Sequence, residues 1–266
     1  MTLPEGTPET NSRRPVAPGE IVWDAPADQS PVSPVFDELT RQRTKEIIAR
    51  YPQSRSALLP LLHLVQSVEG FVSQDGIRYC AEALGLSTAE VSAVATFYTM
   101  YKRTPCGEHL VSVCTNTLCA ALGGDEIYER LQNRLGIGHE ETAGEPGTRG
   151  SITLEHADCL GACDLAPVLQ VNYEYYDNQT PQSAVELVDA LRRGERPHPT
   201  RGAPLTDLRT VELELAGVFD DLERTVEGLS VADETLRGAR LATERGWTAP
   251  AMPDQPPAFP DLPEKS

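Results

Sequence analysis

The sequence predicts an α/β protein in which a small helical domain precedes a domain of alternating strands and helices. In residues 36–103, apolar side chains recur at the spacing of amphipathic helices. In residues 104–195, short strand-like runs alternate with helical segments. The chain of 266 residues is long enough for one or two such domains.

Proline placement predicts where this folded body begins and ends. Seven of the 22 prolines lie in residues 1–34 and nine in residues 197–266, which leaves six for the middle of the chain. Proline removes a backbone donor and is concentrated in linkers and irregular segments. We therefore expect Pro-rich extensions at residues 1–35 and 196–266.

The helical domain is expected to contain helices whose ends are marked by capping residues. Four apolar residues recur at helical spacing: Leu58, Leu61, Leu62 and Val65. Pro60 fits that helix if it begins near Ser56, because proline is tolerated in a first turn. Ser73 and Ser87 are predicted N-caps, the latter with a glutamate three residues later, and Gly85 suits a helix end.

Three residues of this part of the chain are not expected to carry chemistry. His63 lies among leucines and is predicted to be a satisfied helix residue, since no histidine–carboxylate constellation is visible nearby. Cys80 falls inside the third helix and is expected to be a small buried apolar residue. Cys106 stands between Pro105 and Gly107, apart from the other cysteines, and is not expected to be a ligand.

The second domain is predicted to have the order β-α-β-β-α. The expected elements are strands at 110–114, 151–156 and 168–172, a hairpin partner at 175–176, and helices at 124–135 and from Pro181 to the turn before Gly194. Gly136 is expected to stop the first helix. Thr180 as N-cap with proline at the first helical position marks the start of the last one.

Four cysteines in two tight pairs are the candidate functional residues. Cys114 and Cys119 are separated by four residues, Cys159 and Cys163 by three, and each pair follows a predicted strand. A 2Fe-2S cluster has two irons that each need two protein ligands, which two such loops supply. A structural zinc more often uses C-x2-C, and disulfides or redox thiols are a further alternative.

The residues around these pairs are strongly acidic. Residues 104–177 contain twelve Asp or Glu, three Arg and no Lys, a sum of −9. The nearest carboxylates, Asp158, Asp164 and Glu155, are expected to disfavour the addition of an electron to an already anionic cluster. We therefore expect a reduction potential a few hundred millivolts below zero, as in all-cysteine 2Fe-2S ferredoxins. Gly161 and Pro167 are expected to shape the second loop so that backbone N–H groups point at sulfur.

Composition excludes several other classes of function. The net charge of −17 argues against nucleic acid as a partner. The longest apolar run, residues 58–65, is too short to span a bilayer, and the N-terminus lacks an export signal, so thiols in a reducing compartment are expected. Neither GxGxxG nor GxxxxGK[ST] is present, and we therefore expect no nucleotide site in this chain.

Several segments resemble one known family. VCTNTLC at 113–119 and CLGACDLAP at 159–167 are similar to the cluster loops of the 24-kDa-type subunit of NADH:quinone oxidoreductase (respiratory complex I), known in the bacterial enzyme as the E-type subunit. The segments 51–73 and 94–107 resemble the helical leader of that family, and the likeness runs from about Phe36 to Gly194. Related subunits of NAD-linked hydrogenases and formate dehydrogenases share these motifs.

This resemblance implies a fold, a cofactor and partners. The second domain would be a thioredoxin-like 2Fe-2S ferredoxin domain whose cluster is held by Cys114, Cys119, Cys159 and Cys163. FMN and NADH would bind a neighbouring flavoprotein subunit, and other peripheral-arm subunits of complex I would be further partners. The chain would be cytoplasmic, peripheral on the inner face of the cell membrane, with no active site of its own. A zinc-stapled bracing subunit is the alternative; a dithiol enzyme is disfavoured, because neither pair is C-x-x-C.

The C-terminal extension is predicted to be partly helical. Six apolar residues fall on one helical face: Leu215, Val218, Phe219, Leu222, Val226 and Leu229. A second helix is expected at 237–245. The stripe suggests either docking on a partner or packing back on the body of the chain.

Overall fold

The structure, a computed structural model, describes residues 36–251. The predicted extension of residues 1–35 and the last part of the C-terminal extension, residues 252–266, lie outside the described residues. Within the described residues the chain forms two compact units, the first ending at Ser230 and the second beginning at Val231.

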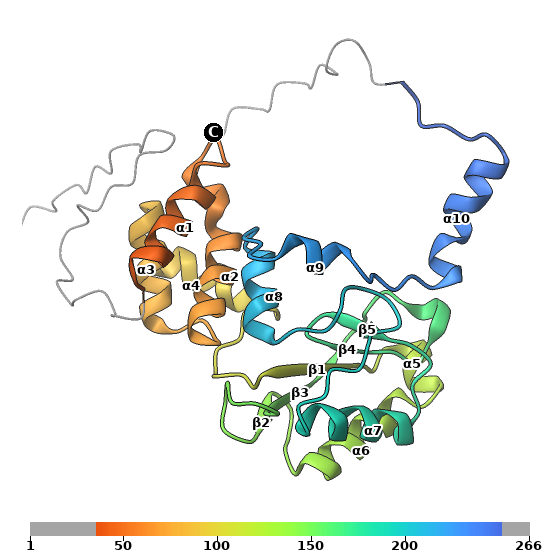
Figure 1. Ribbon diagram of the computed structural model, residues 1–266. Coiled ribbons are helices and arrows are strands. Elements are labelled where there is room, and N and C mark those ends of the chain that lie inside the picture. The colour runs from red at the N-terminus through yellow and green to blue at the C-terminus, as the bar shows by residue number, and fades with distance from the viewer. Residues whose placement is uncertain (1–35, 252–266) are drawn as a thin grey trace, which may run out of the picture. The chain divides into compact units, whose positions relative to one another are not determined.

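The N-terminal part of the first unit consists of four helices around one apolar core (Figure 1). Their bounds are α1 Glu38–Ile48, α2 Leu58–Glu69, α3 Gln74–Leu84 and α4 Thr88–Phe97, with a 3₁₀ turn at Ser54–Ala57 before α2. The predicted caps are confirmed: Ser73 accepts from Gly76 N–H, Ser87 forms a capping box with Glu90, and Gly85 ends α3 at a φ of 65°. Cys80 is fully buried in this core, as predicted.

The following part is a five-stranded sheet in the order β2-β3-β1-β4-β5. The strands are β1 His109–Cys114, β2 Glu141–Ala143, β3 Ile152–Ala157, β4 Leu169–Val171 and β5 Glu174–Tyr176. β1 and β3 are parallel, and the other neighbouring pairs are antiparallel. The helices of this part are α5 Thr117–Ala121, α6 Gly124–Leu135 and α7 Pro181–Arg192, with a 3₁₀ turn at Cys163–Leu165.

Helices α6 and α7 lie together on one face of the sheet (Figure 1). Ile127 and Leu131 of α6 and Val188 of α7 share an apolar core with inward-facing residues of β1, β3 and β4. Both helices have the predicted ends, because Gly136 stops α6 and the Thr180–Pro181 pair opens α7. The predicted α/β fold is thus confirmed, while α5 and β2 were not predicted.

The C-terminal extension begins by packing back onto the body of the chain. Helix α8, Leu208–Leu215, lies against α2, and Ala216 is buried in the core of the N-terminal helices. The prediction of one continuous helical face was wrong, since Gly217 adopts a φ of 79° and separates α8 from α9, Leu222–Val226. Beyond that break the stripe residues are about half exposed: Phe219, Leu222, Val226 and Leu229.

The second unit contains one described helix, α10, Asp233–Glu244, which confirms the helix expected near residue 237 but begins four residues earlier. None of its residues is buried. Across the described range 36–251, we find no helix long and apolar enough to cross a membrane.

A buried polar network joins the N-terminal helices to the sheet. His63 Nδ1 of α2 lies 2.6 Å from Glu212 Oε2 of α8, and the Tyr173 hydroxyl, in the β4–β5 turn, donates to Glu212 Oε1 at 3.1 Å. Glu212 is fully buried. His63 is thus the satisfied helix residue that was predicted, and its partner is a carboxylate from 149 residues further along the chain.

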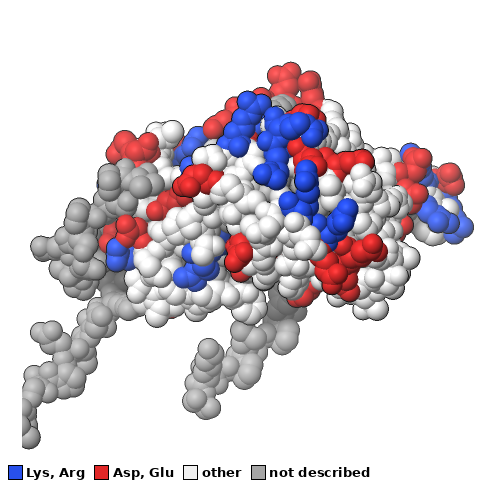
Figure 2. Space-filling view, turned by 90° about the horizontal axis from the view of Figure 1, so that it is seen from below, with Lys and Arg blue, Asp and Glu red and all other residues white. Residues whose placement is uncertain are grey.

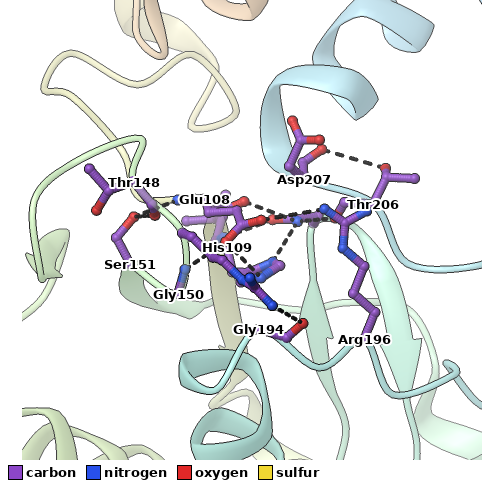
Figure 3. Close-up of polar contacts among 12 residues, drawn as sticks. Glu108, His109, Thr148, Gly150, Ser151, Gly194, Arg196, Thr206 and Asp207 are labelled. Atoms are coloured by element: carbon purple, nitrogen blue, oxygen red, sulfur yellow. Dashed lines mark hydrogen bonds and ion pairs between the residues drawn. The ribbon is translucent and has the colours of Figure 1, made fainter.

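A second polar network surrounds the start of β1 (Figure 3). The Glu108 carboxylate accepts the Gly150 N–H at 2.6 Å and lies 3.4 Å from the Arg196 guanidinium. The side-chain amide of Asn172 lies 3.2 Å from His109 Nδ1. The same amide nitrogen donates to Thr206 O at 2.7 Å and lies 3.3 Å from Glu108 O.

This environment makes a prediction about pH. Burial lowers the pKa of His109, with the Glu108 carboxylate opposing that effect and Arg196 adding to it. As pH falls below about 6.5, the unfolded chain takes up a proton at this site before the folded one does, so stability is lost by up to about 1.4 kcal/mol per pH unit. Urea unfolding between pH 7.5 and pH 5.5 should show that the free energy of unfolding falls less steeply with pH in His109→Gln than in the parent protein. Identical slopes in the two proteins would contradict this role.

Candidate metal centre

The two cysteine pairs lie at the same edge of the sheet. Cys114 is the last residue of β1 and Cys119 lies in α5, which follows directly. Cys159 and Cys163 lie in the loop that leaves β3. Because β1 and β3 are parallel neighbours, with Cys114 opposite Ala157, both loops start from their carboxyl ends side by side. The Thr115 N–H donates to Ala157 O at 3.1 Å and ties the two loops together.

Burial and neighbouring thiols both act on the pKa values of Cys119 and Cys163. Burial, together with the neighbouring thiols of Cys114 and Cys163, raises the pKa of the Cys119 thiol to about 11. Desolvation and the thiols of Cys159 and Cys114 likewise raise the pKa of Cys163. The two loops thus place the four predicted cysteines at the same end of β1 and β3.

The two pairs differ in their exposure to solvent. Cys114 and Cys119 are each 2% exposed and pack with Ala162 and Val168, whereas Cys159 and Cys163 are exposed. Among residues 36–251, no three His, Cys, Asp or Glu side chains are arranged around a single ion. Each of the two loops carries two cysteines, and a donor set of two thiols per loop fits the two irons of a 2Fe-2S cluster, which each need two protein ligands.

Backbone amides are directed at the sulfurs, as predicted for the second loop. The Gly161 N–H points at Cys159 Sγ, with nitrogen and sulfur 3.4 Å apart. Gly161 has a φ of 70°, a conformation that residues with a side chain rarely adopt. The Val168 amide faces the Cys119 sulfur and lowers its pKa against the effect of burial. Such donors stabilise negative charge on sulfur.

The loop that carries Cys159 and Cys163 is held from several sides. The Tyr175 hydroxyl of β5 donates to Leu160 O at 2.7 Å. The backbone N–H of Asn178 donates to Leu165 O at 2.9 Å, and that of Gln179 to Pro167 O at 2.8 Å. These bonds fix the positions of the two exposed cysteines.

The charge around the site differs from the prediction. The surface carries both signs of charge, since Figure 2 shows basic side chains beside acidic ones on the face in view. The Glu155 carboxylate pairs with the buried Lys102 ammonium, and Asp164 pairs with the Arg201 guanidinium. Both cations lie outside residues 104–177, so the sum of −9 overstates the field. Of the three nearest carboxylates, two are offset by a cation.

The two remaining cysteines lie apart from this group. Cys80 belongs to the core of the N-terminal helices. Cys106 is 4% exposed and packs with Leu110 and Leu208, and burial raises the pKa of its thiol to about 11. That neither of them is a ligand remains a prediction.

A cavity of about 360 Å³ lies at the opposite end of β1 from Cys114. Arg149, Arg196 and Arg209 line it together with Glu108 and Asp207. The start of β1 is about 17 Å from its end, which separates the cavity from the cysteines.

Comparison with known proteins decides the family. The sequence model described as thioredoxin-like 2Fe-2S ferredoxin matches residues 44–192, more than half of the chain. This chain belongs to the thioredoxin-like 2Fe-2S ferredoxin family. The match begins inside α1 and ends with α7. It includes the other N-terminal helices, the whole sheet, α5 and α6.

The relatives of this ferredoxin-family chain are named as subunits of NADH-quinone oxidoreductase or NADH dehydrogenase. The E-type subunit of NADH-quinone oxidoreductase from Mycobacterium tuberculosis is 49% identical over 95% of the chain and 98% of its own length. The same subunit from Rickettsia bellii is 38% identical over 59% of the chain and 93% of its own length. The mitochondrial NADH dehydrogenase (ubiquinone) flavoprotein 2 of Dictyostelium discoideum is 35% identical over 66% of the chain and 70% of its own length. The predicted resemblance is confirmed.

Proposed function

We propose that this chain is an electron-transfer subunit of an NADH-quinone oxidoreductase, in which Cys114, Cys119, Cys159 and Cys163 hold one 2Fe-2S cluster. The observation that carries the proposal is the meeting of two cysteine pairs at one sheet edge, with their sulfurs close enough to influence one another. The family match to thioredoxin-like 2Fe-2S ferredoxins and the names of the relatives support it.

The protein's own groups have separable tasks at this site. The thiolates of the buried pair and of the exposed pair would hold the two irons, and the N–H groups of Gly161 and Val168 would stabilise negative charge on sulfur. When bound, a 2Fe-2S cluster accepts and returns one electron. Four thiolate ligands favour a potential well below zero, and the cations of Lys102 and Arg201 make it less negative than unpaired carboxylates would.

The partners belong to the same proposal. The chain lacks a nucleotide-binding motif, so NADH and FMN are assigned to a flavoprotein subunit that lies next to the cluster. The other neighbours are peripheral-arm subunits of the complex. The location that follows is the cytoplasmic face of the cell membrane, reached through the complex.

Spectroscopy tests the cofactor. The purified full chain should absorb in the visible and, after reduction by a strong reductant, give an S = 1/2 EPR signal from one unpaired electron. A midpoint potential a few hundred millivolts below zero is expected. Zinc in place of iron, with neither signal, would establish the bracing-subunit alternative.

Reconstitution tests the division of labour. Calorimetry should detect no NADH binding to the isolated chain, and no oxidation of NADH by an artificial acceptor should occur until the flavoprotein subunit is added. Tight NADH binding by this chain alone would refute the electron-carrier role.

A further inference from the structure

One cation of the C-terminal extension reaches the cysteine loop. Residues 200–202 lie alongside β5, where the Tyr175 N–H donates to Arg201 O at 3.1 Å and the Thr200 N–H to Tyr175 O at 2.8 Å. This strand-like pairing fixes the backbone of Arg201 at the edge of the sheet. Arg201 lies beyond residue 192, where the family match ends.

The guanidinium of Arg201 bridges two carboxylates. Its NH1 lies 3.1 Å from both oxygens of Asp164, the residue that directly follows Cys163. Its Nε donates to Asp177 Oδ2 at 2.9 Å, and its NH2 bonds the other oxygen of Asp177. The side chains of Arg201 and Asp177 are 14% and 3% exposed. A planar guanidinium with five donors can hold both groups at once, which a lysine cannot.

The same side chain touches the second anchor of the loop. The Arg201 guanidinium lies over the Tyr175 ring, 5.4 Å from its centre. The hydroxyl of that tyrosine holds Leu160 O, inside the Cys159–Cys163 loop. Arg201 therefore acts on both ends of the loop, through Asp164 and through Tyr175.

We propose that Arg201 is a positioning residue for the loop of Cys159 and Cys163, and that its charge raises the reduction potential of the cluster held there by offsetting Asp164. This inference rests on the proposed function. The sign follows from electrostatics, because a nearby positive charge favours an added electron and a nearby negative charge opposes it. The two partners must therefore act in opposite directions on the potential.

Two variants separate this role from a merely structural one. Arg201→Gln removes the cation, so the equilibrium constant for one-electron reduction of the cluster should fall about tenfold. This corresponds to a midpoint potential about 59 mV more negative. Asp164→Asn removes the anion, so the midpoint should rise. Both variants break the bond to the loop. Hydrogen exchange of amides 159–166 in the cluster-free full chain should therefore become faster in both.

Two further variants serve as controls. Arg201→Lys keeps the positive charge but loses the bidentate guanidinium. Its midpoint potential should therefore stay close to that of the parent, while the amides of the loop should exchange faster. Arg134→Gln breaks a similar bidentate pair, with Asp189 on α7 at 2.9 and 2.8 Å, away from both cysteine loops. It should change neither readout.

Redox titration with EPR detection measures the midpoint potentials, and hydrogen-exchange mass spectrometry measures the protection of the loop. Midpoint shifts of the same sign in Arg201→Gln and Asp164→Asn, or shifts no larger than that of Arg134→Gln, would overturn the proposal. If Arg201→Gln does not fold, because Asp177 is left buried and unpaired, then Asp164→Asn and Arg201→Lys decide, and an unchanged midpoint in Asp164→Asn refutes the charge effect. A wild-type chain that holds no cluster refutes the proposed function instead, and the exchange experiment still tests the positioning role.

Discussion

Replacing any one of Cys114, Cys119, Cys159 and Cys163 by Ser is expected to remove most of the visible absorption and the EPR signal of the purified chain. Each cysteine is the proposed sole thiolate at one coordination position, and a serine hydroxyl is a far poorer ligand for iron at neutral pH. Absorption spectra and iron content of the four variants, with folding checked by circular dichroism, measure the effect.

Burial decides which variants are the cleanest test. Cys159 and Cys163 are exposed, so their serine variants should bleach with little change in the thermal stability of the cluster-free protein. Cys114 and Cys119 pack in an apolar cluster, where a hydroxyl also costs stability. Cys80→Ala and Cys106→Ser are the matched controls. Bleaching in either control, with the fold intact, would show that the wrong four cysteines were assigned.

The second large effect is expected at Glu212. Glu212→Ala leaves the buried His63 and the half-buried Tyr173 without their shared partner, and each buried polar group left unsatisfied costs about 1–3 kcal/mol. Urea unfolding of the full chain should show this loss, while the exposed Glu129→Ala on α6 should stay within about 0.5 kcal/mol of the parent.

A triple variant identifies the cause of that loss. His63→Leu, Tyr173→Phe and Glu212→Met together replace all three polar groups by apolar ones, which is often nearly neutral. It should therefore lose less stability than Glu212→Ala. An equal or larger loss would mean that the shape of the site, and not the unpaired polar group, determines the cost.

Local chemistry explains what could be predicted from the sequence. The capping box of Ser87 and Glu90, the Thr180–Pro181 start of α7 and the stop at Gly136 each depend on groups within a few residues. Helix ends in these places were therefore predicted to within a residue. The cysteine pairs were recognised for the same reason, because their spacing is itself the signal.

The features that were missed depend on distant contacts. The three residues of β2 form a strand only by pairing with β3, and α5 has five residues, too few for a periodic pattern. Glu212 resembles any helix glutamate until His63 is seen beside it. Nothing near Arg201 in the sequence shows that it reaches Asp164, so the acidic surroundings of the cysteines were overestimated.

The packing of α8 on α2 has a consequence for how the chain folds during synthesis. The core of the N-terminal helices includes Ala216 and borders Leu213 and Val218, which the ribosome adds about 150 residues after Leu62. Until those residues emerge, one apolar side of α2 is left uncovered on the nascent chain. Contacts between residues so far apart in the sequence slow folding and prolong the exposure of aggregation-prone apolar surface. The N-terminal helices therefore reach their final stability only after α8 and Ala216 have been translated.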